Sequence, residues 1–252
     1  MNRPLPGFAL PYKDPVCHDG TAAPDCLHCS VRHLSICSAL GMEEAQALEA
    51  VTTTMPLAEG ATLARTGDTR RHVYTLTDGA LRLVRTMADG RRQVAGFVLP
   101  GDYVGLTESL KYRYDVEAIT NSQVCRVAIT DMQQLRTQYP QLERKLLQRA
   151  CLELDAAQDA ALALARMQPT EKLADFLLTL ASRLARDGDG RNLVALPMGR
   201  GDIADHLGLT METVSRTFTK LRLQGLIALP QLHTVEIRDF AGLHKLASNE
   251  TD

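Results

Sequence analysis

The chain contains 252 residues, of which 45% are apolar and 23% are charged, a composition that is ordinary for a globular protein with room for two modest domains. Its formal net charge of -2 excludes a strongly basic surface overall, although a nucleic-acid-binding face can be local. No stretch approaches the roughly 18 apolar residues of a membrane-spanning helix, and residues 1–15 lack the apolar segment of a secretory signal. We therefore expect a cytoplasmic protein that does not contact a membrane.

The N-terminal region is rich in cysteine. A reducing compartment disfavours disulfides, so metal or redox chemistry is favoured. Three thiols within the stretch PDCLHCSVRHLSICSA have the spacing C-x2-C-x7-C, and a [4Fe–4S] cluster takes four thiolates. The fourth would come from Cys17, Cys125 or Cys151, and Cys125 lies in the strand-like segment QVCRVAI, which would present it from a rigid wall. The six cysteines are Cys17, Cys26, Cys29, Cys37, Cys125 and Cys151.

Zinc is the main alternative to a cluster. Cys17 and the three thiols of the motif would complete an all-thiolate tetrahedral site within the N-terminal arm. The nearby His18, His28 and His33 are further candidate ligands, although isolated histidines of this kind are more often solvated. Cys151 falls in the middle of a predicted helix, where the role of a small buried hydrophobic residue explains it adequately.

After a short helix over Glu43–Val51, the pattern becomes typical of strands. From about Met55 to Ile129, recurrent glycines separate short runs of alternating apolar residues. Asp78-Gly79 and Asp89-Gly90 each lie between two such runs, and Asp-Gly is a strong hairpin signal because glycine accepts the positive φ of the turn. This region predicts an antiparallel roll of the jelly-roll type.

The next region has a helical period. Between Asp131 and Met167 there is no glycine and Pro140 is the one proline, which predicts a long helix over 131–168 that Gln168-Pro169 ends. Apolar residues recur along it at intervals of 3, 4, 3, 4 and 3, as in the seam of a coiled coil. The alternative is that the helix packs this stripe on its own domain, but the strict spacing and small alanines favour a homodimer. The seam residues are Leu147, Ala150, Leu154, Ala157, Ala161 and Leu164.

The last third of the chain predicts a winged helix–turn–helix. A helix over 170–186 precedes two amphipathic segments, 200–207 and 210–224, which Gly208 joins. Strands near 226–229 and 233–237 follow, and they would form the wing.

The second helix of this motif presents a polar face that suits DNA. Glu212, Ser215 and Arg216 lie at i, i+3 and i+4, so they project from one face. Arginine donates two hydrogen bonds to guanine, glutamate accepts one from cytosine, and serine can approach a thymine. The alternative is that this face is simply exposed to solvent and its charges pair locally. The surrounding helix–turn–helix motif favours binding to DNA. The residues expected to contact phosphates are Thr210, Thr213, Thr217 and Lys220.

These parts together resemble the CRP/FNR superfamily of bacterial transcription regulators, over roughly residues 24–240. RGDIADHLGLTMETVSR resembles the FNR type, whose E-x-x-S-R motif matches Glu212, Ser215 and Arg216, whereas the cyclic-AMP-binding branch has R-E-x-x-x-R. The resemblance implies half-sites similar to TTGAT, with Ser215 near a thymine and the other two at a G·C pair. It also implies contact with RNA polymerase, for which the Asp89-Gly90 hairpin is one exposed candidate.

The resemblance bears on the ligands as well. Cyclic-nucleotide-binding members carry a cassette similar to G-E-L followed by R-S, whereas this chain has GLTESLKYRYDVEA, in which Tyr114 follows Arg113. We therefore expect no cyclic nucleotide to bind. In FNR-type regulators the fourth cluster ligand is similarly a cysteine late in the roll. The ligand set that the resemblance implies is Cys26, Cys29, Cys37 and Cys125.

The sequence thus predicts an α+β protein in four parts: a cysteine-rich sensing arm (1–42), a cyclic-nucleotide-binding-like β-roll (43–130), a dimerisation helix (131–168) and a winged helix–turn–helix domain (169–252). The expected function is oxygen-responsive control of anaerobic and microaerobic genes by a [4Fe–4S] protein that binds palindromic DNA as a dimer. The alternative is a regulator on the same scaffold that senses nitric oxide, carbon monoxide or redox state with zinc or free thiols. No glycine-rich phosphate loop, GxSxG or HExxH is present, so we do not expect an enzyme.

Overall fold

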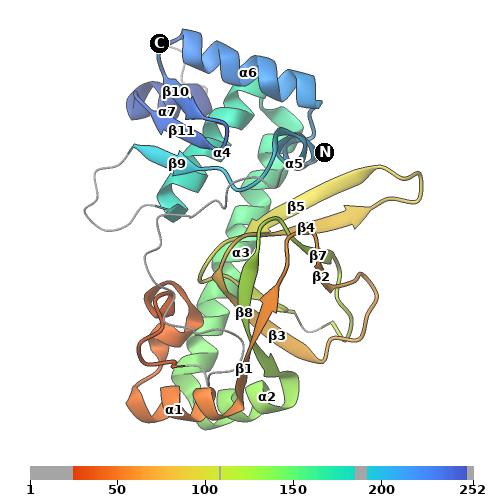
Figure 1. Ribbon diagram of the computed structural model, residues 1–252, viewed down its shortest axis with the longest axis vertical. Coiled ribbons are helices and arrows are strands. Elements are labelled where there is room, and N and C mark those ends of the chain that lie inside the picture. Colours follow the sequence, from red (N-terminus) through yellow and green to blue (C-terminus); the bar gives the residue numbers. More distant parts are fainter. Residues whose placement is uncertain (1–24, 108, 185–191, 249–252) are drawn as a thin grey trace, which may run out of the picture. The chain divides into compact units, whose positions relative to one another are not determined.

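The computed structural model describes residues 25–107, 109–184 and 192–248. The chain divides into two compact units, of which the first ends at Asp155 and the second begins at Ala156. The α+β class is confirmed, with an antiparallel β-roll, a long helix and a C-terminal helix–turn–helix (Figure 1). No helix among the described residues is long and apolar enough to span a membrane.

The first unit is built on two four-stranded antiparallel sheets. One has the strand order β1-β8-β3-β6 and the other has the order β2-β7-β4-β5. Apolar side chains such as Leu76, Leu81 and Val124 form a buried core between them. The strands are β1 (Thr52–Leu57), β2 (Thr62–Ala64), β3 (His72–Asp78), β4 (Leu81–Thr86), β5 (Arg92–Val98), β6 (Tyr103–Val104), β7 (Asp115–Ala118) and β8 (Ser122–Ala128).

The β1-β8-β3-β6 sheet is covered on its other face as well. There Val73 of β3 packs in a second core with Ile36, Leu48 and Leu142. Because both faces are covered, the middle of β3 is buried continuously instead of at every second residue. The elements that pack in this core are η2 (Ile36–Ala39), α1 (Met42–Val51), α2 (Ile129–Gln138) and the first part of α3 (Pro140–Arg166), and η1 (Arg32–Leu34) precedes them in the arm.

One of the two predicted hairpins is present. Asp89-Gly90 connects β4 to β5, which pair from Leu81↔Val98 to Thr86↔Arg92. The prediction of a hairpin at Asp78-Gly79 was wrong, because β3 and β4 belong to different sheets. Both glycines have the expected positive φ, 86° at Gly79 and 84° at Gly90. A tight turn therefore forms at both places, but the packing around it decides which sheet the chain enters next.

The predicted helix over 131–168 is two helices. α2 ends at Gln138 and α3 begins at Pro140, where the first turn of a helix tolerates a residue without an N–H group. Tyr139 between them has φ -122° and ψ 88°, outside the helical region, because proline sterically disfavours a helical conformation of the residue before it.

The second unit combines the helix–turn–helix with a small sheet. The predicted wing strands are present as β10 and β11, which pair antiparallel. A strand that the sequence analysis missed, β9, pairs with the other edge of β11. The elements are α4 (Pro169–Leu184), β9 (Leu193–Ala195), α5 (Arg200–Leu207), α6 (Met211–Leu223), β10 (Ile227–Gln231), β11 (Thr234–Ile237) and α7 (Phe240–Ser248).

We expect Gly79→Ala to destabilise the first unit far more than Gly90→Ala. Both substitutions place a side chain at positive φ, which costs about 1 kcal/mol. At Gly79 the new methyl group would also lie 2.6 Å from the Asn121 carbonyl oxygen and 2.7 Å from Ser122 Cα, whereas at Gly90 it meets open space. The total loss at Gly79 should therefore reach about 3 kcal/mol or more. Equal losses in denaturant unfolding would contradict this account of the turn.

Candidate cysteine site and DNA-recognition helix

The four predicted cluster ligands line one cavity. Cys125 lies on β8, opposite Thr54 of β1 and Thr75 of β3, so it sits in the interior of the sheet. Because side chains alternate along a strand, Val124 points into the roll while Cys125 faces the N-terminal arm. The cavity measures about 30 Å³, and its lining includes Cys26, Cys29, Cys37 and Cys125.

The arm around this cavity is held by hydrogen bonds of its own. Arg32 donates to the carbonyl oxygen of Cys26 at 3.2 Å and also to that of Leu40, which closes the loop at both ends. The buried Ser35 accepts a hydrogen bond from the Cys37 amide at 3.2 Å. The Cys26 amide donates to a Glu49 carboxylate oxygen of α1 at 2.8 Å, so the loop is also fixed to the first helix.

The environment of the Cys37 thiol favours its neutral form. Burial raises the pKa of this thiol, and the neighbouring Cys29 acts in the same direction. The hydrogen bond with Ser35 and the charge of Arg32 oppose this shift without cancelling it. A ligand that needs thiolates would therefore have to compensate for the desolvation of Cys37.

The described thiols line one cavity but are not gathered around a single point. In the described part of the chain, no three His, Cys, Asp or Glu side chains are placed to hold a single metal ion. Zinc needs its sulfur ligands about 2.3 Å from one point, whereas a [4Fe–4S] cluster takes one thiolate at each of four irons. A cavity of about 30 Å³ is close to the volume of one water molecule, so holding a cluster would also require the arm to move away from β8.

The remaining candidates for ligands are placed as follows. Cys17 and His18 lie outside the described residues. Cys151 is exposed on α3 and does not line the cavity. His28 is exposed and its ring nitrogen lies 2.8 Å from an Asp25 carboxylate oxygen, so a local pair explains it. None of the described cysteines forms a disulfide.

The helix–turn–helix has the local geometry that its sequence predicts. Gly208 ends α5 with a left-handed backbone at φ 65°, and Thr210 caps α6 by accepting a hydrogen bond from the Thr213 amide at 3.1 Å. The inner face of α6 is buried through Val214 and Phe218. The opposite face is therefore presented to solvent.

The proposed reading residues all lie on that exposed face. Glu212 and Arg216 form an ion pair at 2.5 Å with side chains that are 70% and 79% exposed, so the pair contributes little stability and can exchange for base contacts. Ser215 is exposed and donates to the Met211 carbonyl oxygen at 2.9 Å.

Three of the four expected phosphate contacts are accessible. Thr210 and Lys220 are exposed, and Thr213 is half-buried. The expectation for Thr217 was wrong, because this residue is buried and its hydroxyl donates to the Thr213 carbonyl oxygen at 2.7 Å. Thr217 lies one residue beyond Arg216 and turns toward the apolar face, a direction that helical spacing already indicates.

Two cations that the sequence analysis missed support this unit, the buried Lys172 and the half-buried Arg200. Lys172 of α4 donates to the carbonyl oxygens of Leu164 and Leu207, each at 3.2 Å, and so joins the ends of α3 and α5. The Arg200 guanidinium lies 3.2 Å from the centroid of the Phe218 ring, and burial lowers its pKa to about 10. A lysine within the apolar stripe of α4 was the available signal for Lys172, since it adjoins Leu173 and Phe176 in that stripe.

Comparisons with known proteins agree with this architecture. A model of the Crp-like helix-turn-helix domain matches residues 171–246, and a model of the cyclic nucleotide-binding domain matches residues 54–139. The chain is 38% identical to the nitrogen fixation regulation protein FixK of Bradyrhizobium diazoefficiens, over 81% of this chain and 86% of that protein.

The chain belongs to the CRP/FNR family. It is 35% identical to the transcriptional activator protein FnrL of Cereibacter sphaeroides, over 90% of this chain and 93% of that protein. The structure of FixK2 from Bradyrhizobium japonicum superposes with a TM-score of 0.73 at 35% identity, over 78% of this chain and 97% of FixK2. Family members are transcription regulators, so this chain is a DNA-binding regulator, and the match to the cyclic nucleotide-binding model describes its roll.

We expect Cys151 to be alkylated before Cys37 in the reduced, cluster-free protein. A raised pKa leaves less Cys37 thiolate at neutral pH, and the thiol is enclosed by the arm, whereas Cys151 is exposed. Raising the pH toward and beyond the pKa of Cys37 should narrow the difference, because more thiolate then forms. Peptide mass spectrometry after timed iodoacetamide exposure measures both rates. Equal rates at neutral pH would contradict the described packing of the arm.

Proposed function

We propose that this chain is an oxygen-responsive transcription regulator that binds a [4Fe–4S] cluster and, as a homodimer, recognises palindromic DNA with TTGAT-like half-sites. The observation that carries the proposal is the meeting of Cys125 with the cysteines of the arm around one cavity. Nearly ninety residues separate Cys125 from Cys37 in the sequence, so the fold alone brings these thiols together.

The cluster residues would be Cys26, Cys29 and Cys37 from the arm and Cys125 from β8. When bound, such a cluster supplies a group that oxygen degrades. Packing within the first unit connects the cysteine site to α3. Ile36 next to Cys37 lies in the same core as Leu142 and Leu146, so a change in the position of the arm alters the packing of the first turns of α3.

The homodimer is supported by the exposed apolar surface of α3. The seam residues Leu147, Leu154 and Leu164 are 64%, 58% and 43% exposed. Exposed leucines repeated along one helix favour pairing with a second copy. Leu152 and Leu162 are exposed to a similar degree, so the apolar surface is broader than the six-residue seam. A dimer would present two copies of α6, as a palindromic site requires.

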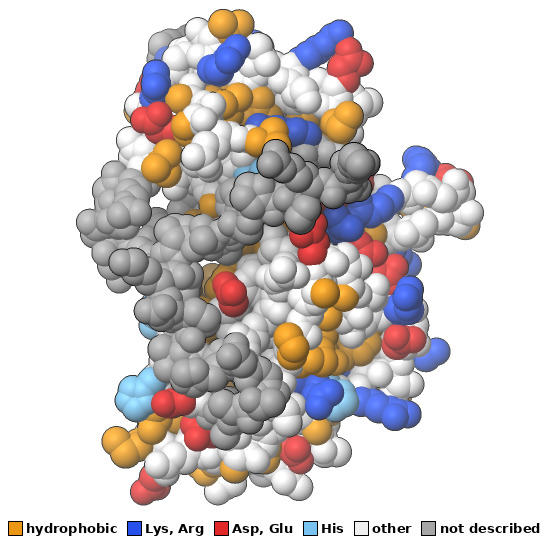
Figure 2. All heavy atoms as spheres, in the orientation of Figure 1, with side chains coloured by type: hydrophobic (Ala, Val, Ile, Leu, Met, Phe, Trp, Pro, Cys, Tyr) orange, Lys and Arg blue, Asp and Glu red, His pale blue; other side chains and the backbone are white. Residues whose placement is uncertain are grey.

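Contact with RNA polymerase is part of this proposal, with the tip of the β4–β5 hairpin as its candidate surface. The hairpin extends away from the roll, and charged side chains of both signs gather at its tip (Figure 2). Arg91 and Asp89 pair there at 2.7 Å, and Met87 beside them is 48% exposed.

Anaerobically purified protein should be brown and contain about four iron atoms and four sulfides per chain. The visible absorption should bleach in air, and DNA binding should weaken with it. Cys125→Ser should abolish the colour, whereas Cys151→Ser, a matched change at an exposed cysteine outside the cavity, should retain it.

A colourless protein with stoichiometric zinc would overturn the cluster and favour the regulator that senses nitric oxide, carbon monoxide or redox state on the same scaffold. Loss of colour in Cys17→Ser but not in Cys125→Ser would assign the fourth ligand to the arm instead.

Arg216→Ala should weaken binding to a TTGAT-containing palindrome by about 1–3 kcal/mol, or about 5- to 150-fold in Kd. The loss should be smaller on DNA whose G·C pair in each half-site is replaced, since the arginine would contribute less there. Arg222→Ala is the control, because Arg222 is also exposed on α6 but points to another side of the helix. Fluorescence anisotropy measures both. If Arg216→Ala binds like the wild type while remaining folded, α6 does not read DNA as proposed.

A further inference from the structure

A second, larger cavity lies in the first unit between the roll, α2 and α3. Its volume is about 180 Å³, and its lining combines apolar and polar side chains. Val73, Leu106, Ile129 and Leu146 provide apolar walls. An apolar cavity of about 150 Å³ accommodates benzene in another protein, so this one has room for a body of that size.

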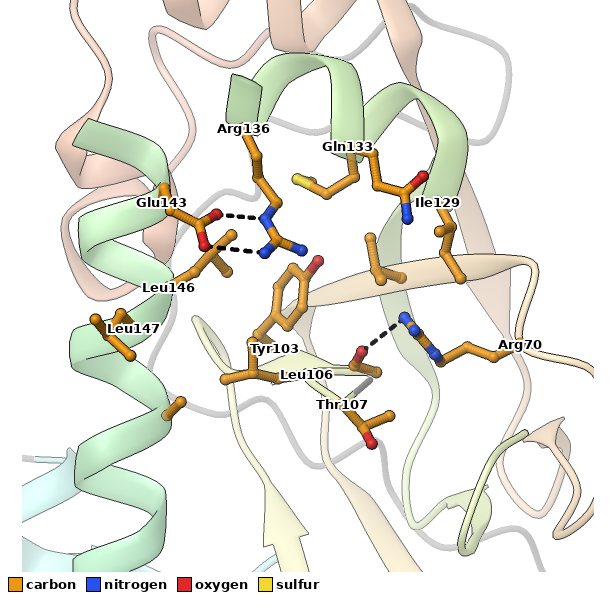
Figure 3. Close-up of a pocket in the computed structure, with 14 residues that line it drawn as sticks. Arg70, Tyr103, Leu106, Thr107, Ile129, Gln133, Arg136, Glu143, Leu146 and Leu147 are labelled. Carbon is orange, nitrogen blue, oxygen red and sulfur yellow. Dashed lines mark hydrogen bonds and ion pairs between the residues drawn. The ribbon is translucent and has the colours of Figure 1, made fainter. Parts of the chain in front are cut away.

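The Tyr103 hydroxyl is directed into this cavity (Figure 3). The residue is only 8% exposed, and its hydroxyl makes no hydrogen bond with any described residue. Burial raises the pKa of Tyr103 further above its already high ordinary value, so the group is a neutral donor at physiological pH. The hydroxyl faces the cavity, so a ligand there that accepts its hydrogen bond would give this donor a protein-side partner in place of solvent.

Cationic side chains border the same space. Arg70 is fixed by donating its Nε to the Ser109 carbonyl oxygen at 2.8 Å and one terminal nitrogen to that of Gly105 at 3.1 Å. Arg136 pairs with Glu143 through two hydrogen bonds, one of them 2.9 Å long, and these hold the pKa of Glu143 below its ordinary value. Among the described residues that line the cavity, two guanidinium groups face one carboxylate, which leaves one net positive charge.

We infer that this cavity binds a small organic monocarboxylate with an apolar body about the size of a benzene ring. The carboxylate accepts from the Tyr103 hydroxyl and lies near the Arg70 guanidinium, while the body contacts the apolar walls. Inorganic anions match the charge but leave those walls unfilled, so the organic ligand is preferred.

A ligand in this cavity would contact residues of α3. Leu147 and Ala150 of α3 line it, and both belong to the predicted dimer seam. Tyr103, Val73 and Met132 line this cavity and also the cysteine cavity. An occupant therefore contacts the helix that we propose pairs two copies. This consequence rests on the proposed dimer, whereas the binding itself does not.

The test uses the full-length, cluster-free chain, so that its outcome is independent of the cluster. Benzoate is titrated and followed by ligand-observed NMR, with benzamide as a neutral probe of the same shape. We expect a Kd of about 1 mM for benzoate, as suits so small a ligand, and at least about tenfold weaker binding of benzamide. Inorganic phosphate should compete weakly.

Variants locate the site. Tyr103→Phe should weaken benzoate binding about 3- to 10-fold by removing one donor, and Arg70→Met should weaken it about tenfold or more. Arg65→Met, a matched change at an exposed arginine outside the cavity, should leave the Kd unchanged. Should Arg70→Met fail to fold, Tyr103→Phe and the benzamide comparison still decide.

Equal binding of benzoate and benzamide, an unchanged Kd in folded Tyr103→Phe and Arg70→Met, or no binding at about 10 mM benzoate would overturn the inference.

Discussion

The first unit depends on the burial of a single sheet from both sides. In β8, Val124 completes the core between the two sheets, while Cys125 and Val127 face the arm and the helices. Because side chains alternate strictly, a shift of one residue in the pairing with β3 would bury the wrong side chain on each face. The same hydrophobic constraint that holds the roll together thus fixes the position of the thiol from the roll. The register of β8 therefore places Cys125, whereas the other three thiols of the site come from the loop of the arm.

The outer core also explains why α3 differs along its length. Its first turns bury Leu142 and Leu146 together with the arm, α1 and α2. From Leu147 onward its leucines are largely exposed. One helix thus carries a stretch that packs against the arm and a stretch whose leucines are exposed. The break at Tyr139 is what permits this arrangement, since an uninterrupted helix would carry α2 away from the sheet that it covers.

In the second unit, the buried Lys172 and the half-buried Arg200 help to hold the elements that carry the exposed face of α6. Lys172 satisfies carbonyl oxygens at the ends of two helices, and Arg200 lies against the ring of Phe218. Lys172 and part of the Arg200 guanidinium lose contact with water, and carbonyl dipoles or an aromatic face replace part of that lost solvation. These contacts hold the inner face of α6 in place. On the outer face, Glu212 and Arg216 form only a weak, exposed ion pair.

The sequence by itself determined the features that arise from local geometry. The Asp89-Gly90 hairpin, the turn at Gly208, the cap at Thr210 and the exposed face of α6 follow from glycine conformation, capping and helical period, which involve residues only a few positions apart. Tertiary structure alone decided which sheet follows Gly79, how Cys125 meets the arm, and how Tyr103 comes to point into a cavity bordered by Arg70 and Arg136. Each of these joins residues that are distant in the chain, and only the packing of whole elements against one another selects among the arrangements that local geometry allows.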